Sequence, residues 1–275
     1  MTEPERSVDG VVIHRDVVHT RVDGYRPLAL DLYVPDSGAA ALCVYAHGGG
    51  WRVGSRRNGP GPLSPTSSRW LARMARRGLA VAAVDYRFSG EARFPAQSDD
   101  LAAAIHWLRS DSTITPPGLP VVAFGVSAGG LLASLAALDP ELDVRACALW
   151  YAVSDVATMP ADQAAVGGPF DPPGQSREEL LIGGVAADLP DLARAASAVH
   201  QVHAGAPPFL LAHGADDVLV PTRQSERLRD ALAAAAVPNE LVVVDGYGHM
   251  FPGMPDDEVA VLVDRTADFL LAHAR

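Results

Sequence analysis

The chain has 275 residues, of which 48% are hydrophobic and 20% are charged. This length and composition predict a globular protein with a large core and exclude an intrinsically disordered chain. The formal net charge is −11, with 22 arginines and no lysine. Such an acidic balance argues against nucleic acid or an anionic membrane as a partner.

Cysteine use and hydropathy narrow the class of protein further. Cys43 and Cys147 both lie in apolar runs, so we expect buried thiols rather than a disulfide framework or a metal site. Residues 1–6 are charged and lack the apolar segment of a signal peptide. No apolar run approaches the roughly 18 residues of a membrane-spanning helix. We therefore expect a cytoplasmic protein without a transmembrane helix.

Hydrophobic patterning predicts alternating strands and helices along most of the chain. Two N-terminal strands, 11–18 and 28–34, are expected to pair antiparallel through a turn at Asp23-Gly24, at the edge of a sheet. Continuous apolar runs predict buried parallel strands at 41–46, 79–84, 119–124, 144–150, 208–212 and 241–244. Helices are predicted from Ser64-Pro65 to Arg77 and at 96–109, 131–138, 222–236 and 257–272.

This alternation fails between residues 154 and 205, which are rich in Ala, Gly, Pro and acidic residues. Short helical pieces are expected near 176–182 and 190–199. An insertion of this length usually carries function, and we interpret it as a small cap over the strand ends. The sequence thus predicts a single α/β domain, residues 1–275. Its eight-stranded sheet is mostly parallel and covered by helices on both faces, with the cap after the sixth strand.

The segment Gly125-Val126-Ser127-Ala128-Gly129 joins an apolar strand to a helical run. In that context Gly-x-Ser-x-Gly is typical of a nucleophile elbow, in which a strained turn presents the serine. The two glycines leave room for neighbouring backbone, and the N–H of Ala128 is expected to point at an oxyanion formed on an acyl group. The alternative is a glycine-rich connection without chemistry.

A second glycine-rich segment, His47-Gly48-Gly49-Gly50-Trp51, follows the third predicted strand. Successive glycines let backbone N–H groups turn into a concave anion site. The alternative is a flexible turn. Trp51 either packs on the core or shapes a pocket for an acyl group.

A serine nucleophile needs a base, and the base needs an orienting acid. His249 follows the last strand and so is expected at the same edge of the sheet as Ser127, which makes it the candidate base. Asp216 and Asp217 follow the strand at 208–212, and spacing alone does not choose between them. Either could instead cap the next helix. His200 and His203 lack an accompanying thiolate or carboxylate set, so no metal site is expected there.

Four blocks of this sequence resemble the α/β-hydrolase superfamily. The resemblance is to esterases related to hormone-sensitive lipase, to the bacterial feruloyl- and acetyl-esterase-like branch, and to kynurenine formamidase. The blocks are His47–Trp51, Asp85–Phe88 with Phe94-Pro95-Ala96, Gly125–Gly130, and His213–Pro221 with Gly248-His249. Val126 stands where relatives of hormone-sensitive lipase usually carry Asp, and few residues precede the second strand. Both departures favour the feruloyl-esterase-like or kynurenine-formamidase-like branch.

The resemblance implies a catalytic set of Ser127, Asp217 and His249, in the chain order typical of α/β-hydrolases. It selects Asp217 because family members place the acid at the fifth residue of a His-Gly-x-x-Asp-x-x-Val-Pro block. It also implies oxyanion donors at the N–H groups of Gly49, Gly50 and Ala128.

We therefore expect a serine carboxylesterase that hydrolyses a small ester through an acyl-enzyme, without a cofactor or metal. An arylformamidase or another amide hydrolase is the alternative with the same residues, and a hydrolase-like protein that only binds is a more remote one. The 52–62 loop and the insertion are expected to decide the substrate. Arg56 and Arg57 in that loop either contact an acidic substrate or are simply solvated. The sequence does not indicate an oligomeric state.

Overall fold

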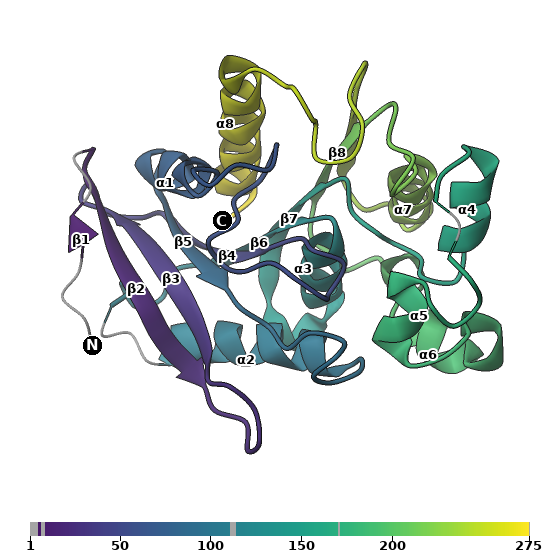
Figure 1. Ribbon diagram of the computed structural model, residues 1–275. Coiled ribbons are helices and arrows are strands. Elements are labelled where there is room, and N and C mark those ends of the chain that lie inside the picture. The colour runs from purple at the N-terminus through teal and green to yellow at the C-terminus, as the bar shows by residue number, and fades with distance from the viewer. Residues whose placement is uncertain (1–4, 7–8, 111–113, 170, 275) are drawn as a thin grey trace.

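The computed structural model describes residues 5–6, 9–110, 114–169 and 171–274 (Figure 1). Residues 1–4, on which part of the expectation about a signal peptide rests, lie outside the described residues. The strands of the described chain are β1 (Glu5–Arg6), β2 (Val11–Thr20), β3 (Leu28–Pro35), β4 (Ala41–Ala46), β5 (Leu79–Val84), β6 (Val121–Val126), β7 (Val144–Trp150), β8 (Phe209–Gly214) and β9 (Asn239–Val244).

These strands form one sheet in the order β1-β2-β3-β5-β4-β6-β7-β8-β9. From β5 to β9 all neighbours are parallel, whereas β1, β2 and β3 pair antiparallel. The eight expected strands are β2 to β9, and the two-residue β1 adds to the outer side of β2. Strands β2 and β3 pair antiparallel near one edge of the sheet, as predicted. Strand β3 lies between β2 and β5. Both of its faces are largely buried.

Helices cover both faces of the sheet, as predicted (Figure 1). Their bounds are α1 (Arg69–Arg76), α2 (Ala96–Ser110), α3 (Ala128–Leu138), α4 (Met159–Ala165), α5 (Arg177–Ile182), α6 (Pro190–Ala195), α7 (Arg223–Ala234) and α8 (Asp256–His273). The buried side chains of α1 and α8 pack with one face of the sheet, and those of α2, α3 and α7 pack with the other. Cys43 and Cys147 are buried free thiols of the central strands, as expected.

The helix expected from Ser64-Pro65 begins later, at Arg69. Ser64 Oγ accepts a hydrogen bond from the N–H of Thr66 at 3.2 Å, so it closes a local turn instead of capping a helix. Short hydroxyl side chains compete in this way with helical backbone bonding. The C-terminal prediction is confirmed, because Gly78 follows the helix with a φ of 108°.

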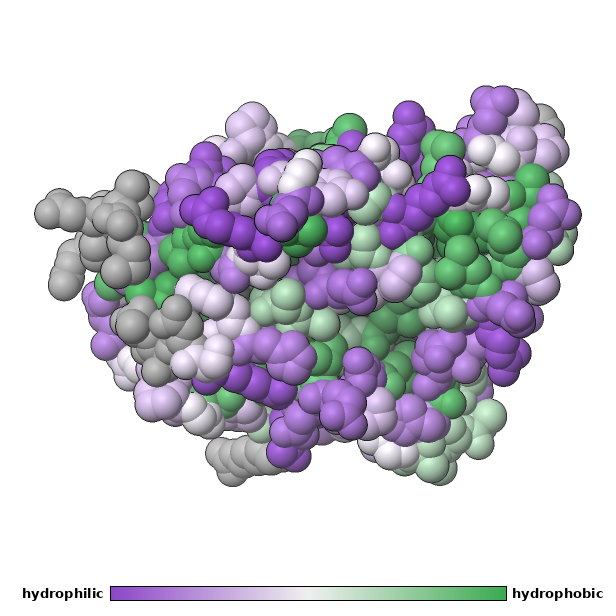
Figure 2. Space-filling model, turned by 90° about the horizontal axis from the view of Figure 1, so that it is seen from below, coloured by the Kyte–Doolittle hydropathy of each residue, from purple (hydrophilic) through white to green (hydrophobic). Residues whose placement is uncertain are grey.

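The insertion between β7 and β8 contains α4, α5 and α6 and lies at the right-hand end of the molecule in Figure 1. The helices α5 and α6 match the predicted pieces, whereas α4 was not predicted. Figure 2 views the molecule from below and shows an apolar area on the right, the end that holds the insertion. None of the described helices is both long enough and apolar enough to span a membrane.

Candidate active site

Ser127 occupies the sharp turn between β6 and α3. Its backbone angles, φ 53° and ψ −123°, are rare for a residue with a side chain. The N–H of Ser127 donates to the carbonyl of Trp150 at 2.9 Å, which fixes the turn against β7. A Cβ on Gly125 or on Gly129 would lie 2.3 Å from a backbone oxygen, so the steric role predicted for both glycines is confirmed. The turn places Ser127 at the carboxyl edge of the parallel strands.

His249 lies on the loop that follows β9, and its ring reaches the turn that holds Ser127. Its Nε2 is 2.9 Å from Ser127 Oγ. Tyr151 packs edge-on against the imidazole, with ring centroids 5.0 Å apart. The next two residues, Met250 and Phe251, have φ values of 67° and 52°, and Phe251 is fully buried. The loop is therefore anchored directly behind the ring, and Ser127 Oγ can donate its proton to Nε2.

Asp217, rather than Asp216, contacts this imidazole. Asp217 is 2% exposed, and its Oδ2 lies 2.7 Å from His249 Nδ1, whereas Asp216 is exposed to solvent. The other carboxylate oxygen, Oδ1, accepts the backbone N–H groups of Leu219 and Val220 at 2.9 and 2.8 Å. Burial raises the pKa of Asp217, but hydrogen bonds from His213 and His249 outweigh it and lower that pKa to about 2. Asp217 is thus held ionised beside His249.

His213, the first residue of the block that selected Asp217, was given no role of its own in the site by the sequence. The ring is fully buried, with Nε2 2.7 Å from the carbonyl of Val220 and 3.2 Å from Asp217 Oδ2. The carbonyl can only accept, so Nε2 carries the proton and Nδ1 accepts from Ser225 Oγ at 2.7 Å. The ring therefore supports the carboxylate from the side opposite His249. The signal for it was present in the sequence, as the His four residues before Asp217.

Two segments bring backbone to the cavity in front of Ser127, the glycine loop and the start of α3. Gly49 and Gly50 have φ values of 124° and 59°, and a Cβ on Gly49 would lie 2.0 Å from the carbonyl oxygen of Val53. Both glycines and Ala128 line the cavity in front of Ser127. Their three N–H groups donate to no acceptor among the described residues. These three residues therefore bring unused backbone donors to the wall of the cavity that Ser127 also lines.

Two aromatic residues fix the glycine loop against the elbow. Trp51 is fully buried and donates its Nε1–H to the carbonyl of Ala128 at 3.0 Å. Tyr86 donates its hydroxyl to the carbonyl of His47 at 2.8 Å and stacks on the His47 ring, with centroids 4.5 Å apart. Trp51 also borders the cavity, so its packing role and its pocket role coexist.

The BD-FAE family profile matches residues 30–232. The chain belongs to the BD-FAE family. Among curated proteins, Esterase LipQ of Mycobacterium tuberculosis is 32% identical over 250 residues, which cover 84% of this chain and 55% of that protein. Esterase LipC of the same organism is 29% identical over 90% of this chain and 64% of its own length. The chain thus spans between about half and two thirds of these relatives.

Solved structures confirm the α/β-hydrolase fold of this BD-FAE chain. A truncated carbohydrate esterase from gut microbiota matches with a TM-score of 0.79 over 98% of both chains, at 22% identity. Thermogutta terrifontis esterase 2, in a structure phosphonylated by sarin, matches with a TM-score of 0.72 over 94% of both chains, at 25% identity.

The cavity of the BD-FAE chain has a volume of about 460 Å³ and opens in front of Ser127. Apolar side chains form much of its wall, with Arg177 and Glu178 entering from α5. The other lining residues outside the elbow and the glycine loop are Val53, Gly54, Asn58, Gly59, Gly61, Leu63, Tyr151, Val153, Leu219, Val220, His249 and Met250. The 52–62 loop and the insertion both contribute residues to the wall of this cavity.

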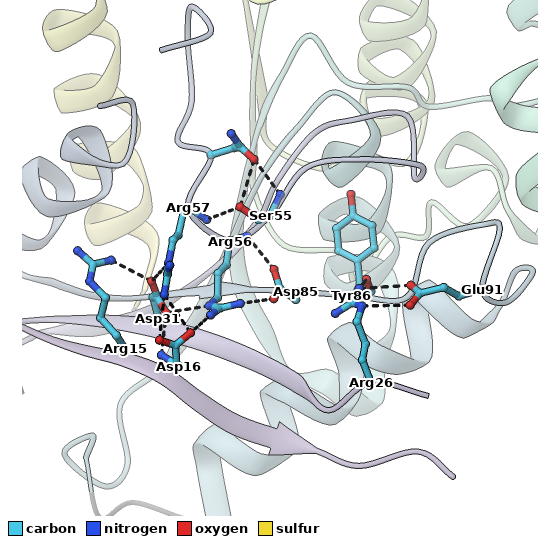
Figure 3. Close-up of polar contacts among 11 residues, drawn as sticks. Arg15, Asp16, Arg26, Asp31, Ser55, Arg56, Arg57, Asp85, Tyr86 and Glu91 are labelled. Carbon is cyan, nitrogen blue, oxygen red and sulfur yellow. Dashed lines mark hydrogen bonds and ion pairs between the residues drawn. The ribbon is translucent and has the colours of Figure 1, made fainter. Parts of the chain in front are cut away.

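Ion pairs hold the 52–62 loop on the antiparallel strands (Figure 3). Arg56 is 13% exposed and reaches the fully buried Asp31 of β3 at 2.8 Å, and it also pairs with Asp85 and Asp16. Arg57 pairs with Asp31 at 3.2 Å and with Asp16 at 2.9 Å. Neither arginine lines the cavity. Neither arginine therefore contacts a substrate in the cavity: Arg56 is mostly buried in ion pairs, whereas Arg57 is half exposed to solvent, as one of the two expectations had it.

Proposed function

We propose that this chain is a serine carboxylesterase that hydrolyses small esters through an acyl-enzyme. The observation that carries the proposal is the hydrogen-bonded series from Ser127 Oγ through His249 to the buried Asp217. The relatives named esterases support it, and so does the unused set of N–H donors beside Ser127.

In the proposed reaction Ser127 Oγ attacks the ester carbonyl carbon while its proton passes to His249 Nε2. The carbonyl oxygen becomes an oxyanion, which the N–H groups of Gly49, Gly50 and Ala128 stabilise. His249 then gives its proton to the departing alcohol, which leaves the acyl group on Ser127. A water molecule attacks this acyl-enzyme and passes a proton to His249, which returns it to Ser127 Oγ as the acid is released. Asp217 keeps the imidazole oriented and stabilises its cationic form.

Replacing Ser127 by Ala tests this proposal directly. We expect kcat on p-nitrophenyl acetate to fall on the order of 10⁴-fold or more, because only binding and oxyanion stabilisation would remain. A fluorophosphonate probe should label the wild type and not the S127A variant. Labelling is a reasonable readout because the Thermogutta terrifontis esterase is phosphonylated by sarin.

The matched control is Ser110→Ala, at the exposed end of α2. It should keep both the activity and the label. Full activity of S127A would refute the nucleophile. The wild type should also be assayed on longer acyl esters, a feruloyl ester and N-formylkynurenine. Preference for N-formylkynurenine over all the esters would favour an arylformamidase instead.

A further inference from the structure

Glu178 is a carboxyl group inside the cavity that the proposed chemistry does not use. It belongs to the first turn of α5, is 4% exposed, and lines the same space as Ser127 and His249. An acidic residue in the first turn of a helix usually interacts with the free N–H groups of the helix N-terminus. In α5 the N-terminus is capped by the neighbouring Glu179, whose side chain forms a capping box with Ser176. Glu178 is therefore not needed as the cap of α5.

The carboxyl of Glu178 has no hydrogen-bond partner on another described residue. Burial is the main reason that the pKa of Glu178 rises to about 7, against the opposing effects of its own backbone N–H and of Arg177. Its own backbone N–H is thus the donor given for this carboxyl, which leaves capacity to accept from a ligand in the cavity. Glu178 is one of the residues that line this cavity.

Two other polar atoms of the cavity wall, Tyr151 Oη and Asn58 Oδ1, already have hydrogen-bond donors. Tyr151 Oη accepts the N–H of Gly61 at 3.1 Å, and the Asn58 carbonyl oxygen accepts from the backbone of Ser55 at 2.8 Å. Glu178 thus offers a free acceptor among largely apolar neighbours, in a site where an ester would lie.

We infer that Glu178 is a specificity-determining residue that binds a hydroxyl group of the substrate. The inference rests on the proposed esterase function and names its substrate class, esters that carry a free hydroxyl group near the scissile bond. A hydroxyl suits this position better than an ammonium group, because the guanidinium of Arg177 lines the same cavity and repels a cation. A carboxyl that is partly protonated at neutral pH can both accept from and donate to a hydroxyl.

The test compares matched esters with and without the hydroxyl. The pairs are p-nitrophenyl 3-hydroxybutanoate with p-nitrophenyl butanoate, and 2-hydroxyethyl acetate with propyl acetate, so each side of the ester is probed. We expect the wild type to prefer the hydroxylated member of at least one pair in kcat/KM. Glu178→Met should reduce that preference about 10-fold, the effect of losing one hydrogen bond in a desolvated site. Glu178→Gln retains a hydrogen-bond acceptor and should keep most of the preference for the hydroxylated ester.

The same substitution at the exposed Glu141, which does not line the cavity, is the control and should leave the preference unchanged. A preference that is absent in the wild type, or equal in wild type and E178M, would overturn the inference. A preference for 2-aminoethyl acetate that E178M removes would also overturn it, in favour of a cation site. Failure of the esterase proposal is distinguishable, because the fluorophosphonate would then not label Ser127 in any variant.

Discussion

At the scale of single residues, the site depends on how Asp217 is kept ionised in a buried position. A carboxylate 2% exposed is unfavourable unless donors surround it. Two backbone N–H groups and the rings of His213 and His249 supply those donors. Because the pKa of Asp217 is lowered to about 2, its charge persists at every pH at which an imidazole changes its protonation.

Replacing His213 by Ala should weaken catalysis without removing any proposed catalytic residue. Asp217 would lose one charge-assisted hydrogen bond, so its pKa would rise and it would hold His249 less firmly. We expect kcat to fall about 10- to 100-fold with a smaller change in KM, and the acid limb of the rate profile to move to lower pH, because a weaker bond to Asp217 stabilises the imidazolium of His249 less. His213→Gln, which can still donate, should recover part of the loss.

His106→Ala, on the exposed side of α2, is the control and should leave the profile unchanged. An H213A variant that loses stability but keeps the wild-type pH profile would show that His213 serves packing alone.

At the scale of elements, the 52–62 loop is a wall of the cavity that is fastened by charge. Arg56 joins this loop to β3 through Asp31 and to the end of β5 through Asp85. The backbone N–H of Arg56 also donates to Asp85 at 2.8 Å. Since Asn58, Gly59 and Gly61 line the cavity, the position of this wall depends on the ion pairs behind it.

Arg56→Met should therefore lower stability and alter substrate binding. Asp31 is fully buried and would keep only Arg15 and Arg57 as ion-pair partners. We expect the free energy of unfolding to fall by about 2 kcal/mol and Tm by about 5 °C, with KM raised more than kcat is lowered. Urea and thermal unfolding measure the first effect, and ester kinetics the second.

Arg57→Met is the matched control, because the Arg57 side chain is 50% exposed and such pairs contribute less than about 1 kcal/mol. Equal losses in both variants would contradict the special role of Arg56.

Some elements and site residues could be predicted from the sequence, and others could not. The parallel strands were predictable because each is a continuous apolar run bounded by turn residues, and Ser127 and His249 because each follows such a strand. Asp217 needed the family pattern, since its neighbour Asp216 has the same chemistry. Glu178 gave no signal, because its place in the cavity depends on how the insertion folds back over the sheet. The predicted start of α1 was wrong because the Ser64 hydroxyl accepts a local hydrogen bond from Thr66 instead of capping the helix.

At the scale of the whole molecule, burial of ionisable groups links stability to pH in two opposing ways. Burial raises the pKa values of Asp31, Asp162 and Asp217, but hydrogen bonds outweigh it and lower all three. Their contribution is complete above the ordinary carboxyl pKa and is lost as the pH falls through the folded-state values. Burial lowers the pKa of His19 to about 4, so the unfolded chain binds more protons between about pH 6.5 and 4. Acidification through that range is therefore destabilising.

Glu178 acts in the opposite direction, and this gives a prediction for the pH dependence of unfolding. Its pKa of about 7, raised mainly by burial, means that the folded chain binds more protons than the unfolded chain between about pH 4.5 and 7. Acidification through that range stabilises the fold through Glu178 and offsets the effect of His19. Burial also lowers the pKa values of His14 and His47, which add to the effect of His19. We therefore expect the free energy of unfolding of the wild type, measured with urea, to fall slowly from pH 7 to 5 and steeply below pH 4. In Glu178→Met the offset is gone, so the free energy should fall more steeply from pH 7 downward. Identical pH profiles of the two proteins would show that Glu178 titrates alike in the folded and unfolded chains.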